Sequence, residues 1–138
     1  MDIIDIDRYR IPRIKEGCFL AVRKFCGGLM LCAVTFPLKV PQVDVLINDR
    51  NQLAFKFERA DGFYFPKVVG TDLKLEKIDS LKLLTESHWF ERYNLHSGEH
   101  YGLCSVVEPR KYLCIKKGRQ RKVGVSWTNQ DCFQITGV

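Results

Sequence analysis

The stretch LCSVVEPRKYLCI, residues 103–115, has the pattern of two strands separated by a turn. Pro109 fixes φ at the turn, and we expect Arg110 and Lys111 to face water there. From Tyr112 onward, aromatic and apolar side chains resume the alternation of a strand and are suited to filling a barrel. The stretch therefore indicates an architecture and carries no chemistry of a reaction.

The same pattern continues through the chain on both sides of this stretch. Short apolar segments alternate with turn signals such as Gly27-Gly28, Asn48-Asp49 and Lys117-Gly118. Only residues 80–87 have the pattern of a helical turn. We predict twelve strands, at residues 9–14, 18–24, 29–34, 43–47, 52–58, 62–68, 72–77, 89–95, 101–105, 112–116, 121–125 and 131–135.

Twelve strands over 138 residues suggest a repeat of about 46 residues. Residues 19–22 resemble residues 112–115, and alternating apolar pairs recur at offsets of 44 and 50 residues. Many short, evenly spaced strands are typical of antiparallel barrels and sandwiches. The sequence predicts an all-β fold, a β-trefoil of twelve strands in three pseudo-repeats with one short helical turn at most.

Length and composition place the chain among ordinary globular domains. With 46% hydrophobic and 28% charged residues, its 138 residues can bury one core, so we expect a single domain over residues 1–138. No apolar run approaches the roughly 18 residues that span a bilayer, which predicts no membrane insertion. Acidic residues in the first seven positions do not fit a signal peptide, so we expect synthesis in the cytoplasm without one.

The positive charge is concentrated late in the chain. The net charge is +6, and seven basic residues between positions 110 and 122 have no acidic residue among them. Such a cluster predicts a polyanion such as heparan sulfate as a partner, with a solvated surface ribbon as the plain alternative. The predicted polyanion-binding residues are Arg110, Lys111, Lys116, Lys117, Arg119, Arg121 and Lys122.

The six cysteines are expected to be reduced thiols within strands, and the absence of a C-x-x-C motif excludes a zinc ribbon. His96, His100 and Cys104 repeat at a spacing of four, but Ser97-Gly98 interrupts any helix that would bring them together. A cysteine and histidine nucleophilic pair would lack an orienting group and an oxyanion donor. We therefore expect neither an enzyme, nor a metal site, nor a cofactor.

Residues 103–115 resemble the motif of the interleukin-1 cytokine family. Seven positions match in register, whereas Leu103 and Ile115 depart from the motif; the matches are Ser105, Val106, Pro109, Tyr112, Leu113, Cys114 and Val123. Weaker similarity covers residues 9–11, 72–76, 89–92 and 131–134. The resemblance implies a monomeric β-trefoil cytokine that binds immunoglobulin-like receptor ectodomains in immune or inflammatory signalling. It also implies secretion by a non-conventional route.

The resemblance further implies receptor contacts on the opening strand and in the loops before the fifth and twelfth strands. The residues so placed are Tyr9, Arg10, Ile11, Asn48, Asp49, Arg50, Asn51, Trp127, Thr128, Asn129, Gln130 and Asp131. Plain solvated turns are the alternative at each position.

Two other classes of protein share the predicted fold. A heparin-binding growth factor of the fibroblast growth factor type is the alternative function, because its basic hairpin would correspond to residues 116–122. A trefoil lectin or protease inhibitor is weaker, since no Q-x-W repeat occurs. The aromatic residues at 63–65 and 89–93 are expected in the core rather than stacked on bases, so no nucleic-acid partner is expected.

Overall fold

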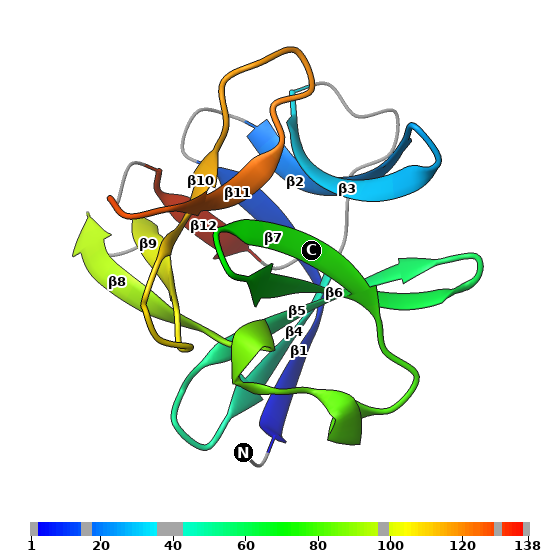
Figure 1. Cartoon of the computed structure of the whole chain (residues 1–138). Helices are drawn as coiled ribbons and strands as arrows, with labels where there is room; N and C mark the ends of the chain where they lie inside the picture. The colour runs from blue at the N-terminus through cyan, green and yellow to red at the C-terminus, as the bar shows by residue number, and fades with distance from the viewer. Residues whose placement is uncertain (1–2, 15–17, 36–42, 97–99, 129–130, 137–138) are drawn as a thin grey trace.

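A computed structural model describes residues 3–14, 18–35, 43–96, 100–128 and 131–136 of the chain (Figure 1). Of the side chains, those of residues 4–14, 94–96, 100, 135 and 136 lie outside the description. The strands are β1 (Ile3–Ile14), β2 (Cys18–Phe25), β3 (Gly28–Val34), β4 (Val43–Asn48), β5 (Leu53–Arg59), β6 (Gly62–Val69), β7 (Asp72–Lys77), β8 (Phe90–His96), β9 (His100–Ser105), β10 (Tyr112–Ile115), β11 (Val123–Ser126) and β12 (Phe133–Thr136). Two 3-10 helices, η1 (Leu81–Leu83) and η2 (Glu86–His88), separate β7 from β8.

All strand pairings among the described residues are antiparallel, and the strands form one nearly closed, barrel-like sheet. Strands β1, β4, β5, β8, β9 and β12 pair in succession, and β12 returns to β1. The hairpins β2–β3, β6–β7 and β10–β11 extend from this sheet (Figure 1). An all-β chain with apolar residues on alternating positions is thus confirmed.

The predicted β-trefoil of twelve strands in three pseudo-repeats is corrected by the structure. β1 has 12 residues, whereas β10, β11 and β12 have 4 each. The joints of the sheet are also unequal, because β1 and β4 share five registered pairs while β5 and β8 share only Leu53↔Phe90. The nearly closed, barrel-like sheet is therefore not a clear trefoil of twelve strands.

Two further predictions about elements are revised. The opening strand begins at Ile3 rather than at residue 9, because the alternating isoleucines and aspartates of residues 3–7 pair along β4. The segment 80–87 forms two helical turns rather than one. Ser80 and Thr85 each accept a backbone N–H with their side-chain oxygen, so each turn has its own N-cap.

The core consists of two clusters of buried side chains. The larger one fills the interior of the sheet and contains Phe55 and Phe90, whose ring centroids are 6.0 Å apart. The smaller one lies under the 3-10 helices and consists of Leu46, Ala54, Phe65, Ile78 and Trp89. Each buried phenylalanine contributes about 1.5–3 kcal/mol by its removal from water. The expectation of core aromatics is confirmed for Phe65, Trp89 and Phe90, whereas Phe63 and Tyr93 are exposed.

The stretch that opened the sequence analysis forms the turn between β9 and β10. The backbone N–H of Ser105 donates to the carbonyl of Lys111 at 2.7 Å, and the N–H of Lys111 donates to Ser105 Oγ at 2.9 Å. Lys111 is buried, with its Nζ 4.7 Å from the centroid of the Trp127 ring. The expectation that Lys111 faces water is therefore wrong. No helix in the described part of the chain is long and apolar enough to cross a membrane.

Candidate anion-binding site

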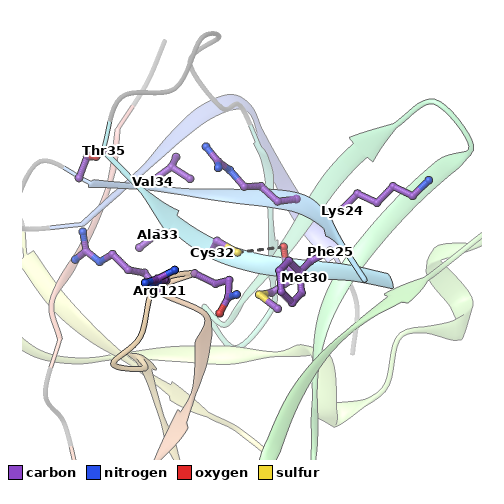
Figure 2. A pocket seen from close by; sticks show the side chains of 11 residues that line it. Lys24, Phe25, Met30, Cys32, Ala33, Val34, Thr35 and Arg121 are labelled. Carbon is purple, nitrogen blue, oxygen red and sulfur yellow. Dashed lines mark hydrogen bonds between the residues drawn. The ribbon is translucent and has the colours of Figure 1, made fainter. Parts of the chain in front are cut away.

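A pocket of about 450 Å³ lies between the β2–β3 hairpin and the segment that joins β10 to β11 (Figure 2). Its floor and walls combine basic, apolar and small polar side chains. They are Arg23, Lys24, Phe25, Met30, Cys32, Ala33, Val34, Thr35, Arg119, Gln120 and Arg121. The pocket thus brings together residues from the first and the last third of the chain.

Backbone contacts hold the β10–β11 segment against β3. The N–H of Ala33 donates to the carbonyl of Arg121 at 3.0 Å, and an isolated bridge pairs Cys32 with Lys122. The N–H of Lys116 closes the segment by donating to the carbonyl of Lys122 at 2.7 Å. Arg121 has φ 48°, a left-handed conformation that is uncommon for a residue with a side chain. These contacts fix the backbone positions from which the side chains of Arg119 and Arg121 extend.

The pocket is lined by four cations and, among its described residues, by no carboxylate. None of Arg23, Lys24, Arg119 and Arg121 forms a salt bridge with another described residue. One nitrogen of Arg121, Nη1, lies 3.1 Å from the sulfur of Cys18, and no other described residue accepts a hydrogen bond from this guanidinium. Uncompensated cations in a concave site raise the local positive potential.

The thiol of Cys32 does not offset this charge. Burial raises the pKa of Cys32, against the lowering influence of Arg23 and Lys122. The thiol therefore stays protonated and neutral near pH 7, and its side chain is within 3.8 Å of the Met30 carbonyl (Figure 2). The described lining of the pocket remains positively charged.

The structure divides the predicted polyanion-binding cluster. Arg110 donates to both carboxylate oxygens of Glu91 at 2.9 and 3.3 Å, and these hydrogen bonds lower the pKa of Glu91. Lys116 Nζ donates to the carbonyl of Val125 at 2.9 Å, and Lys122 Nζ lies 3.5 Å from Asp72 Oδ1.

Lys111 is buried, and the described residues provide no such partner for Lys117 and Arg119, while Arg121 lies beside a thiol. Arg23 and Lys24 join them in the structure, although sequence reasoning missed both. The available signal was their place at the end of a strand next to the Gly27-Gly28 turn, where side chains are exposed on both faces.

Among the described residues, none of the predicted receptor-binding residues lines this pocket. Tyr9, Arg10 and Ile11 lie within β1, and their side chains are outside the description. Asn48 is fully buried, and its Oδ1 accepts the N–H groups of Arg50 and Gln52 at 3.0 Å each.

Asn48 therefore shapes the β4–β5 turn, whereas Asp49, Arg50 and Asn51 are exposed on it. In the last loop, Trp127 and Thr128 are exposed, and Asn129 and Gln130 lie outside the described residues. Asp131 Oδ2 accepts the N–H of Ile115 at 2.8 Å, so this carboxylate anchors β10. Whether any of these residues binds a receptor stays a prediction.

The described part of the chain holds no group of three or more histidine, cysteine or acidic residues that could bind a metal ion. All six cysteines are free. An all-β scaffold with a basic pocket is, as a class, suited to binding an anionic ligand.

Comparison with known proteins finds similarity of structure alone. No family model and no curated protein sequence matches the chain. Among solved structures, the lysenin pore matches all of this chain and 50% of its own, with a TM-score of 0.61 and 9% identity. Lysenin in complex with phosphocholine matches 99% of this chain and 47% of its own, with a TM-score of 0.57 and 12% identity. The chain spans about half the length of these solved chains.

This comparison corrects the expected cytokine of the interleukin-1 family. The matched structures are of lysenin rather than of a cytokine, and at such low identity they inform the fold only. In this fold the serine of the matched motif has a structural role, because Ser105 holds the β9–β10 turn through its two hydrogen bonds with Lys111. Any β protein that needs this turn can use the same residues.

Proposed function

We propose that this chain is a binding module for anionic groups, sulfate or phosphate esters carried on a polyanion. The observation that carries the proposal is the pocket that gathers Arg23, Lys24, Arg119 and Arg121 with no carboxylate among its described lining. Guanidinium groups bind such oxyanions through paired N–H donors, and three of the four cations are arginines. The proposal needs no catalytic group.

A polymer suits the distribution of the cations better than a single ion. Lys24 and Arg121 lie toward opposite sides of the pocket (Figure 2). The exposed Lys117 continues the positive charge along the β10–β11 segment. Charge spread along a line can meet successive anionic groups and displace the counterions of each, which makes binding strongly salt-dependent.

The described lining of the pocket is less suited to a zwitterionic headgroup than to an anionic ligand. One of the solved neighbours is a complex of lysenin with phosphocholine. A quaternary ammonium is usually held by aromatic faces. The described pocket of this chain has one aromatic residue, Phe25, and four cations that would repel the ammonium. The charge balance therefore supports an anionic ligand.

The test compares two triple variants that remove the same charge. Arg23→Ser, Arg119→Ser and Arg121→Asn empty the pocket of guanidinium groups, with asparagine chosen because it tolerates the left-handed conformation. Arg50→Ser, Lys77→Ser and Lys82→Ser remove three exposed cations from elsewhere. We expect the pocket variant to elute from immobilised heparin at much lower salt than the native chain, and the control to shift slightly.

Thermal unfolding of both variants establishes that they are folded. Equal elution shifts in the two variants would overturn the proposal, since binding would then follow net charge alone. Binding to inorganic polyphosphate and to phosphatidylcholine vesicles completes the test. Retention on zwitterionic vesicles that does not depend on the three arginines, with no binding to either polyanion, would also contradict it.

A further inference from the structure

The basic pocket has an apolar end formed by Phe25 and Met30, which lie beside each other (Figure 2). Phe25, the last residue of β2, is 43% exposed, which is unusually open for a large aromatic residue. Resting on the proposed function, we infer that the pocket takes a sulfated saccharide, with its sulfate groups on the arginines and one sugar ring stacked on Phe25.

The hairpin explains why the ring of Phe25 is free to stack. Phe25 is paired across the strands with Gly28, which has no side chain to cover the ring. Between them, Cys26 and Gly27 both adopt positive φ, 47° and 81°, so the turn is tight. The ring is therefore carried at the end of a two-stranded ribbon with no side chain directly opposite it.

The chemistry of a sulfated sugar matches both parts of the pocket. A pyranose presents a face of C–H groups that packs on an aromatic ring, while its ester groups project from the ring edge as anions. Inorganic polyphosphate has the anions and lacks the apolar face. The pocket volume of about 450 Å³ lies within the usual range for small-ligand sites, so a ring and its substituents fit the scale of the site.

The experiment measures two ligands against variants of the whole chain. The ligands are a heparin-derived oligosaccharide and inorganic polyphosphate. Phe25→Ala should weaken oligosaccharide binding by about three- to tenfold, the usual effect of one aromatic contact, and should leave polyphosphate binding unchanged. Phe25→Tyr should retain oligosaccharide binding, whereas Phe25→Leu should weaken it about as much as Phe25→Ala does, because leucine keeps apolar bulk but has no ring face.

Phe63→Ala is the matched control, since Phe63 is also exposed but belongs to β6, outside the pocket. Equal loss of both ligands in Phe25→Ala, or no loss of either, would overturn the saccharide inference. Neither outcome would affect the result from the arginine variants. If instead the arginine variants bind both ligands normally, the proposed anion site itself fails.

Discussion

Two regions of this molecule treat charge in opposite ways. Beneath the 3-10 helices, the fully buried His88 places Nε2 2.9 Å from Glu76 Oε1, and Lys67 Nζ lies 3.3 Å from Glu76 Oε2. Around the β2–β3 hairpin, the cations of the pocket have no described carboxylate beside them. The two regions lie at different ends of the sheet (Figure 1). One region uses charge to hold the fold, and the other leaves charge available to a ligand.

In the first region, the hydrogen-bonding groups of the buried histidine are all paired. The N–H of Thr85 donates to His88 Nδ1 at 2.9 Å, so Nε2 carries the proton and donates it to Glu76. The edge of this imidazole also meets the ring of Phe65, at a centroid distance of 6.4 Å. Every polar atom of the imidazole has a partner within the chain, which leaves this residue no capacity for a ligand.

Among the changes that distinguish the two regions, we expect replacement of Phe65 to have the largest effect, on the stability of the fold. Replacing this buried ring by alanine removes its packing against the second core cluster and leaves a cavity. We expect Phe65→Ala to lower the free energy of unfolding by about 3–5 kcal/mol, measured by chemical denaturation. Heparin elution of the folded protein should not change. Loss of heparin binding without loss of stability would contradict the division into two roles.

An intermediate effect on the stability of the fold is expected when the pH is lowered. Burial lowers the pKa of His88 below its usual 6.5, although Glu76 acts to raise it. As pH falls through about 6.5, the unfolded chain gains a proton that the folded chain does not, so stability decreases. For Glu76, partial burial acts to raise the pKa, but hydrogen bonds from His88 and Lys67 leave it lowered. Its contribution is lost only at lower pH.

The measurement compares the free energy of unfolding at about pH 7.5 and about pH 5.5 for the native chain and for His88→Gln. The native chain should lose stability over this interval, and the variant should lose less of it. The variant should also be less stable by about 1–3 kcal/mol at the higher pH, since a buried hydrogen-bonding group is disturbed. A pH dependence that is identical in the two proteins would exclude His88 as its source.

The smallest effect is expected when Lys122 loses its acidic partner. This change tests whether one more unpaired cation in the second region strengthens polyanion binding. Asp72→Asn removes the partner of Lys122, while the amide oxygen can still accept the N–H of Leu73 as the carboxylate does. Because both side chains are nearly half exposed, we expect less than about 1 kcal/mol of change in stability. Heparin elution should move to higher salt. Asp79→Asn, next to the 3-10 helices, is the control for net charge and should move it less.

The sequence was most informative about the strands. Each of the twelve predicted segments overlaps a strand of the structure, and β7 has the predicted bounds, residues 72–77. Alternation is a local property, so each strand could be predicted from its own residues. The relation between strands depends on long-range pairing, and the expected equal repeats were wrong there.

The site was less predictable, because salt bridges across the sheet are not visible in sequence spacing. Arg110 and Glu91 are 19 residues apart, and Lys122 and Asp72 are 50 apart. These pairings remove two of the seven cations from the predicted cluster. Conversely, Arg23 precedes Arg121 by 98 residues, and only the folded sheet brings the two into one pocket.

The bond between the Ala33 N–H and the Arg121 carbonyl has a consequence for how the molecule forms. Contacts between residues so distant in sequence close large loops and are costly in entropy, so they form slowly. The pocket cannot exist until the final strands have joined the first hairpin, and a partly folded chain does not have it. Any ligand selective for the pocket therefore binds the completed fold alone, and it raises the melting temperature by mass action, more so as its concentration exceeds its Kd.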